Sequence, residues 1–204
     1  REDAEYVWVL DPIDGTKSFI AGFPIWGTLI ALLHRGTPVF GMMHQPYIGE
    51  RFSGDSGSAH YSGPSGERKL TVRRCASLQE ATSYTTSPLL MNTADREAFR
   101  RVESQVRLTR YGGDCYSYCM LAAGHLDLVI ETELKPYDIA ALIPIITGAG
   151  GAFCAGGAGL LALVVAAASG PVLDAGFPDK GFWPLTFVGV ALVLITLIGR
   201  RSGS

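Results

Sequence analysis

The hydrophobic and polar positions along this chain of 204 residues alternate in a way that predicts both strands and helices. An apolar run at residues 6–10 predicts a buried strand. Two β-favouring runs at residues 25–34 and 39–44 predict a hairpin, because Arg35-Gly36-Thr37-Pro38 between them is typical of a turn. Further segments predict helices at 16–21, 93–105, 114–123 and 137–147, and strands at 71–74, 83–86 and 126–130.

The stretch at residues 53–66 interrupts this pattern with many glycines and serines, and it predicts an exposed excursion between short strands. Thr93 precedes apolar residues at helical spacing and is the expected N-cap of the helix at 93–105. Because predicted helices alternate with predicted strands between residues 71 and 147, we expect an α/β fold whose sheet layers are covered by helices.

The last quarter of the chain has a different composition. Residues 139–173 carry no charge, and an apolar segment at 182–199 is followed at once by Arg200-Arg201. About twenty apolar residues span a bilayer core, so this segment predicts a transmembrane helix whose end faces the cytoplasm. The alternatives are an apolar core helix, or a tail produced by a reading-frame change or gene fusion. We expect a domain at residues 1–151 and an apolar tail at 152–204.

Charge and cysteine usage exclude some classes of protein. The formal net charge is −2 and no basic cluster is present, so the chain lacks the charge distribution of a nucleic-acid-binding protein. The four cysteines lack paired C-x-x-C spacing, which argues against a zinc site. Cys115 and Cys119 are expected to be buried free thiols on one helix face. With no export signal visible, we expect a cytoplasmic protein, associated with a membrane if residues 182–199 insert.

The motif Asp11-Pro12-Ile13-Asp14-Gly15-Thr16 places two carboxylates at the end of the first apolar run. Hard oxygen ligands of this kind are what Mg²⁺ selects, and the proline restricts the turn that would bring them together. The residues after Asp14 can open a helix, whose free N–H groups would suit an anion. The motif therefore predicts a metal and phosphate site, with a plain turn formed by Asp-Pro and Asp-Gly as the alternative.

Extended by Lys17-Ser18-Phe19, this motif resembles the metal-binding signature of the inositol monophosphatase superfamily. The second signature of that superfamily resembles Tyr137-Asp138-Ile139-Ala140-Ala141-Leu142, followed by Gly148-Ala149-Gly150-Gly151. The resemblance implies a layered αβαβα sugar-phosphatase-like fold and a phosphomonoesterase that uses two or three Mg²⁺ ions and is inhibited by Li⁺. It covers residues 6–151. The superfamily's upstream Gly-Glu-Glu motif and its last αβ unit have no counterpart here, so we expect a fold that is incomplete at the N-terminus.

Flanking segments resemble one branch of the superfamily, the histidinol-phosphate phosphatases of histidine biosynthesis. These segments are Lys17-Ser18-Phe19-Ile20, Gly27-Thr28-Leu29-Ile30-Ala31-Leu32, His44-Gln45-Pro46 and Tyr111-Gly112-Gly113-Asp114-Cys115-Tyr116. The partner implied is a small phosphorylated metabolite, and a homodimer is compatible with the resemblance. Two alternatives stay open: a phosphatase for inositol phosphate or another small sugar or nucleotide phosphate, and a catalytically inactive, membrane-tethered remnant.

The resemblance also implies a role for individual residues. Asp11, Asp14 and Asp138 would hold metal, together with the carbonyl oxygen of Ile13. Gly15 and Thr16 would bind phosphate through their N–H groups, and Thr16 and Asp14 would act in catalysis.

Substrate binding would fall to Gly113, Asp114 and Glu131, and the carboxylates of Asp114 and Glu131 suit the amine and imidazole of histidinol phosphate. As alternatives, Thr16 is only a cap, Asp114 only a helix N-cap, and Glu131 a solvated strand end.

Overall fold

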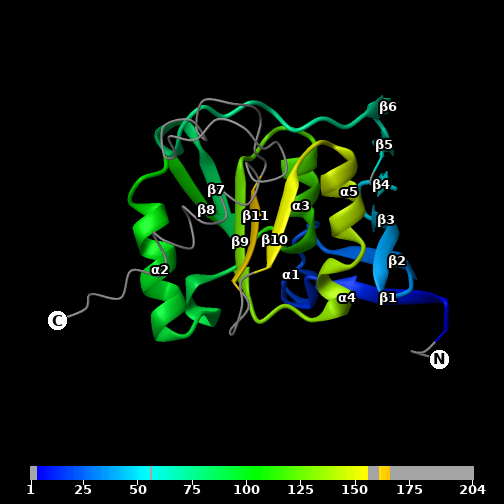
Figure 1. Ribbon diagram of the computed structural model, residues 1–204, viewed down its shortest axis with the longest axis horizontal. Coiled ribbons are helices and arrows are strands. Elements are labelled where there is room, and N and C mark those ends of the chain that lie inside the picture. The colour runs from blue at the N-terminus through cyan, green and yellow to red at the C-terminus, as the bar shows by residue number, and fades with distance from the viewer. Residues whose placement is uncertain (1–3, 56, 156–160, 166–204) are drawn as a thin grey trace.

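The computed structural model describes residues 4–55, 57–155 and 161–165, and these residues form four layers (Figure 1). A six-stranded sheet is followed by a layer of helices, a five-stranded sheet and one further helix on the outer side of that second sheet. The predicted α/β fold with helix-covered sheets is confirmed.

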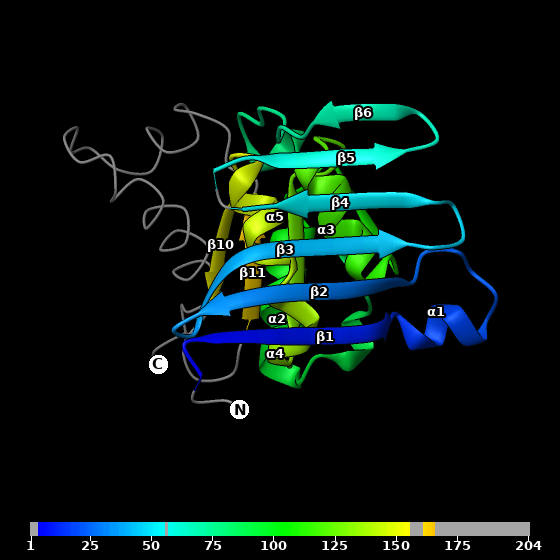
Figure 2. The ribbon, with the colours of Figure 1, turned by 90° about the vertical axis from the view of Figure 1, so that its right-hand side faces the viewer.

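The first sheet is antiparallel throughout, and its strands follow one another in chain order (Figure 2). The predicted hairpin is confirmed, with a turn at Arg35 and Gly36, both of which have positive φ. The excursion predicted at 53–66 is wrong, because this segment belongs to the sheet and buries Ala59 and Tyr61. The strands are β1 (Tyr6–Asp14), β2 (Gly27–His34), β3 (Thr37–Gln45), β4 (Glu50–Gly54), β5 (Ala59–Gly63) and β6 (Gly66–Lys69).

The first strand differs from its prediction in burial. β1 lies at the edge of the sheet, and the side chains of Tyr6, Trp8 and Leu10 are 57, 58 and 57% exposed. Val9, on the opposite face, packs against the core. Among the described residues, helices cover only one face of this sheet (Figure 1). The apolar residues of β1 are therefore alternately exposed and partly buried.

Three helices fill the layer between the sheets: α3 (Asp114–Ala122), α4 (Pro136–Ile139) and α5 (Leu142–Gly148). The segment predicted as a single helix at 137–147 is divided into two, because the helical hydrogen bonds are interrupted at Ala140 and Ala141, although both keep helical φ and ψ. Pro144 explains the break, because it has no N–H to donate to Ala140 and its ring would crowd that carbonyl in a continuous helix.

α5 lies unusually close to the first sheet because glycines line the contact. A Cβ added at Gly41 of β3 would lie 1.8 Å from the carbonyl oxygen of Ala141. A Cβ added at Gly148 would lie 2.4 Å from the carbonyl oxygen of Ser58. This backbone-to-backbone contact fixes the position of α4 and α5 relative to β1, where the first motif lies.

The second sheet has the order β10-β11-β9-β7-β8. β7 runs parallel to β8 and β9, whereas β11 is antiparallel to β9 and β10. The strands predicted at 83–86 and 126–130 are present, displaced by one or two residues. The strand predicted at 71–74 is wrong; Val72 there donates its N–H to Ala149 outside any ladder. The strands are β7 (Thr82–Thr85), β8 (Leu108–Tyr111), β9 (Leu128–Thr132), β10 (Ala152–Ala155) and β11 (Leu161–Val165).

The remaining helices are α1 (Thr16–Ile20), directly after β1, and α2 (Thr93–Glu103), on the outer side of the second sheet (Figure 1). Short 3₁₀ turns lie at Leu78–Glu80 and Pro88–Leu90. Asn92, and not Thr93, caps α2, because its side chain accepts a hydrogen bond from the N–H of Asp95. The segment 182–199 lies outside the described residues. None of the helices that the structure describes is long and apolar enough to cross a membrane.

Candidate metal and phosphate site

The end of β1 carries the first two aspartates of the predicted site. Residues three apart in a regular strand point to opposite faces, but the pairing of β1 with β2 shifts between Asp11 and Asp14. The hydroxyl of Thr28 donates to the Pro12 carbonyl at 2.8 Å, and Asp11 Oδ1 accepts from the Ile13 N–H at 3.1 Å. This irregularity allows both carboxylates to turn toward the same place.

Asp138 reaches the same place from α4, which lies beside β1. Its Oδ2 accepts a hydrogen bond of 2.7 Å from the N–H of Lys135 at the start of that short helix. One carboxylate oxygen from each of Asp11, Asp14 and Asp138 lies within 4.8 Å of the other two. The structure therefore brings the three predicted carboxylates together from two segments that are more than 120 residues apart.

The electrostatics of this cluster fit a divalent cation. The pKa of Asp14 is raised to about 6, mainly by burial; hydrogen bonding from Cys115 opposes the rise, and the nearby Asp114 and Asp11 carboxylates add to it. Burial also raises the pKa of Asp138. In the part of the chain that the structure describes, no Lys, Arg or His makes a salt bridge with any of the three. Lys135 is near enough to oppose the rise at Asp138 but forms no salt bridge with it. Converging, half-buried carboxylates that no cation bridges are the donor set that Mg²⁺ prefers.

Asp14 also joins the metal loop to α3. Its Oδ2 accepts a hydrogen bond of 2.8 Å from the N–H of Cys115 in the first turn of that helix. The N-cap position is occupied by Gly113, with φ of 101°, and Asp114 follows with φ of 43°. The alternative that Asp114 is the N-cap is therefore wrong, because the free N–H of this turn is satisfied by Asp14.

Glu131 lies on β9 and is only 6% exposed, so the alternative of a solvated strand end is wrong. Its Oε1 accepts hydrogen bonds from both the N–H and the hydroxyl of Thr86, at 2.5 and 2.7 Å. Burial raises the pKa of Glu131 to about 7 despite these bonds, and the Asp114 and Asp14 carboxylates contribute to the rise.

A cavity of about 300 Å³ connects these groups. It is lined by Asp14, Asp114, Glu131, Glu133 and Asp138, and its lining contains no basic residue. The hydroxyl of Tyr118, which also lines it, is buried without a hydrogen-bond partner among the described residues. A buried polar atom without a partner is uncommon in folded proteins and fits a site built to receive a polar ligand.

The residues after Asp14 have local partners. Gly15 takes a left-handed conformation with φ of 77° and occupies the N-cap position of α1 without a side-chain cap. Thr16, in the first turn, donates its hydroxyl to the Ile13 carbonyl at 2.9 Å, so the alternative that Thr16 is the cap is wrong. That carbonyl keeps a second lone pair for a metal. Lys17 is exposed.

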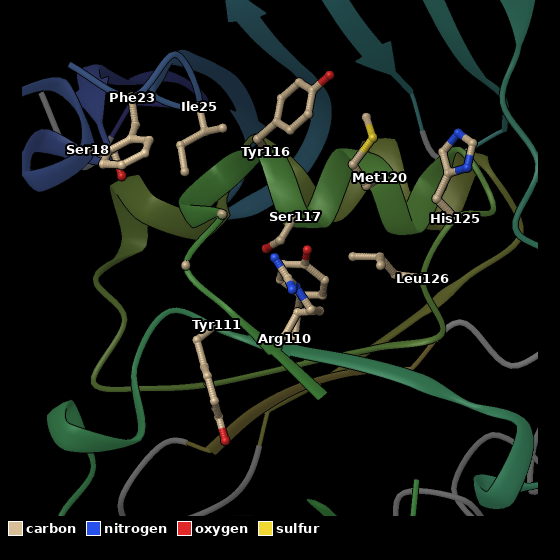
Figure 3. Close-up of a pocket in the computed structure, with 13 residues that line it drawn as sticks. Ser18, Phe23, Ile25, Arg110, Tyr111, Tyr116, Ser117, Met120, His125 and Leu126 are labelled. Carbon is tan, nitrogen blue, oxygen red and sulfur yellow. The ribbon is translucent and has the colours of Figure 1, made fainter. Parts of the chain in front are cut away.

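A second cavity, of about 630 Å³, lies on the other side of α3 (Figure 3). Its lining is largely apolar, with Arg110 and His125 as basic groups. Figure 3 shows Ser18 and Phe23 at one end and His125 at the other. Ser18 lines this cavity and also hydrogen-bonds Asp114 of the first cavity, so it lies between the two.

The layered α/β fold and its cluster of three aspartates define a protein with a candidate divalent-metal site next to a helix start. The model of the inositol monophosphatase family matches residues 1–177, and the chain belongs to that family.

Relatives and solved structures agree with this assignment. The chain is 52% identical over 151 residues to "Bifunctional phosphatase IMPL2, chloroplastic" of Arabidopsis thaliana, covering 74% of this chain and 43% of that protein. It is 35% identical over 147 residues to a histidinol-phosphatase of Mycobacterium tuberculosis, covering 71% and 56%. It therefore spans roughly half the length of these relatives. A structure of an inositol monophosphatase from Zymomonas mobilis superposes with a TM-score of 0.75 at 36% identity, over 93% of this chain and 72% of that one.

Three residues of the site were assigned no role from the sequence: Ser18, Thr86 and Tyr118. Thr86 and Glu131 are 45 positions apart, and Ser18 and Asp114 are 96 apart. Local patterns do not report such pairs. Tyr118 lies one helical turn after the candidate residue Asp114 on α3. This spacing is the one signal in the sequence that indicates a position of Tyr118 near the site.

Proposed function

We propose that this chain is a Mg²⁺-dependent phosphomonoesterase that hydrolyses histidinol phosphate to histidinol and phosphate. The observation that carries the proposal is the cluster of Asp11, Asp14 and Asp138, whose oxygens converge within 4.8 Å beside an acidic cavity. Three relatives named as histidinol-phosphatases, at 32 to 35% identity, support this substrate.

The acids around the cavity favour a substrate that carries positive charge. Asp114 and Glu131 line it in addition to the aspartates that would hold metal. Histidinol phosphate has an anionic phosphate and a cationic amine, so its two ends call for opposite partners. Metal would receive the phosphate, and Asp114 or Glu131 would receive the amine through a charge-assisted hydrogen bond.

Each group of the chain then has a defined task. Asp11, Asp14, Asp138 and the Ile13 carbonyl would hold Mg²⁺, which when bound polarises phosphate oxygens and favours deprotonation of water. The N–H groups of Gly15 and Thr16 would orient the phosphate.

Beyond the metal loop, Thr16 would orient the attacking water with its hydroxyl, and the N–H of Gly113 would lie against the substrate. The Thr86 hydrogen bonds hold Glu131 in one orientation toward the cavity.

The test is phosphate release by the purified protein from histidinol phosphate and from inositol 1-phosphate, with Mg²⁺ and with EDTA. We expect Mg²⁺-dependent release, inhibited by Li⁺, with the larger kcat/KM for histidinol phosphate. The variant Asp11→Asn keeps the size of the side chain but loses its charge, and it should abolish release.

Two results would change the proposal. A larger kcat/KM for inositol 1-phosphate would favour the other activity, for which a relative of Aquifex aeolicus named as a fructose-1,6-bisphosphatase/inositol-1-monophosphatase, 32% identical, is the precedent. Mg²⁺-independent release, or equal release by Asp11→Asn, would refute the role of the aspartate cluster.

A further inference from the structure

The carboxylate of Asp114 is held by a residue that lies outside the acidic cavity. The hydroxyl of Ser18 donates a hydrogen bond of 2.5 Å to Asp114 Oδ2. It is the one hydrogen bond to this carboxylate among the described residues. A carboxylate has about four lone-pair sites, so Oδ1 remains available to a ligand in the cavity.

The backbone and side chain of Asp114 are both constrained. Its φ of 43° lies in the left-handed region, which residues other than glycine rarely adopt. Its side chain lies directly over Gly15, since a Cβ added there would be 3.0 Å from Cβ, Cγ and Oδ2 of Asp114. The carboxylate can therefore move little as long as Ser18 holds Oδ2.

Ser18 is itself in a fixed position. It lies within α1, and its carbonyl accepts a hydrogen bond of 2.9 Å from the N–H of Phe23. The next residue, Phe19, packs edge-on against Trp26 with ring centroids 5.0 Å apart. Figure 3 shows Ser18 beside the beginning of α3, on the side of the second cavity. The helix that follows the metal loop thus carries the hydroxyl that orients Asp114.

We propose that Ser18 is a positioning residue that orients the Asp114 carboxylate and so sets the preference of the site for phosphate esters that carry a cationic amine. The inference rests on the proposed function, because it assigns the amine of the substrate to Asp114. Without the Ser18 hydroxyl, the carboxylate gains rotational freedom and must be ordered when the amine binds.

The experiment compares Ser18→Ala, Asp114→Asn and the double variant by steady-state kinetics on histidinol phosphate and on inositol 1-phosphate. Ser18→Ala should raise KM for histidinol phosphate about 3- to 10-fold, the net value of one ordinary hydrogen bond, because the hydroxyl acts on the amine only through Asp114; kcat should stay within about twofold. KM for inositol 1-phosphate, which has no amine, should not change. In the Asp114→Asn background the same substitution should add no further loss, because the two residues act as one unit.

Two variants complete the design. Ser18→Thr keeps a hydroxyl at this position and should restore most of the affinity. Ser62→Ala removes a hydroxyl that bonds Glu67 on the distant β5–β6 hairpin and should leave both substrates unaffected.

The outcomes separate the two claims. Wild-type turnover of histidinol phosphate combined with an unchanged KM in Ser18→Ala would overturn the role of Ser18 and leave the proposed function standing. An equal effect on both substrates, or an undiminished effect in the Asp114→Asn background, would also overturn it. Failure of the wild-type protein to release phosphate from histidinol phosphate would overturn the proposed function and this inference together.

Discussion

Gly41 lies where β3 touches the turn between α4 and α5, so Gly41→Ala tests how the fold holds Asp138 in the cluster. An added Cβ would be 1.8 Å from the Ala141 oxygen and 2.7 Å from its carbonyl carbon. Carbon and oxygen atoms that touch are normally at least about 3.3 Å apart. The turn would have to move by roughly 1.5 Å, and Asp138, three residues earlier, would move with it.

The cost follows from the kind of atoms that meet. Adding a methylene to a well-packed core costs about 1–3 kcal/mol when side chains can adjust. Here both partners are backbone, so neither can change rotamer, and the cost should lie at the upper end, about 3 kcal/mol. For a chain of this size that corresponds to a fall in Tm of roughly 6–12 °C.

Two measurements test this. Urea unfolding in EDTA gives the free energy of unfolding, and thermal unfolding with and without Mg²⁺ gives the change in Tm. Gly41→Ala should lose about 3 kcal/mol of unfolding free energy, and Mg²⁺ should raise its Tm less than that of the wild type because the carboxylates no longer converge. Gly57→Ala is the matched control, since its added Cβ would meet only Asp55 Oδ1 at an ordinary 3.5 Å. A Gly41→Ala protein within about 0.5 kcal/mol of the wild type, with the full Mg²⁺ effect, would refute the reasoning.

Three further substitutions test individual contacts. The pKa of Glu131 is about 7 in the folded protein against an ordinary value of 4.5, so wild-type stability should fall as pH rises from about 4.5 to 7. Glu131→Gln should lack this slope and gain up to ~3 kcal/mol relative to the wild type at pH 8, by urea unfolding in EDTA; parallel pH profiles would contradict this. Asp127 is 1% exposed and is paired with Arg73 and the Thr82 N–H. Asp127→Ala should lower the free energy of unfolding by about 3 kcal/mol, measured by the same urea unfolding. Tyr118→Phe removes an unpartnered buried hydroxyl, so thermal unfolding should show equal or higher stability. A loss above ~1 kcal/mol would mean that this hydroxyl makes a stabilising hydrogen bond.

Local signals predicted much of the fold where one segment determines its own structure. The hairpin of β2 and β3 follows from two apolar runs around Arg35 and Gly36, and α2 from apolar residues at helical spacing, of which Ala98, Phe99 and Val102 are buried. The segment 53–66 was misjudged because its glycines and serines are typical of loops. Position 54 requires glycine because α5 packs directly on it: an added Cβ would be 2.5 Å from the Pro144 oxygen. That reason is visible only in the packed structure.

The candidate site likewise has a part that the sequence predicts and a part that only the structure shows. Asp11, Asp14 and Asp138 belong to motifs that the sequence shows directly, and the structure brings them together; their role as metal ligands stays a prediction. The partners that orient the site, Ser18 and Thr86, contact residues far along the chain. Their roles depend on how α1, α3 and the second sheet meet, which a single sequence does not reveal.

The central claim is that the three aspartates form one divalent-cation site. Calorimetric titration of Mg²⁺ into the protein tests it most directly, with Asp138→Asn as the comparison. Because a carboxylate near the cation contributes several kcal/mol even at an effective dielectric constant of 20, we expect saturable binding by the wild type and at least about tenfold weaker binding by Asp138→Asn. Absence of binding by the wild type, or equal affinity in the two proteins, would contradict the account.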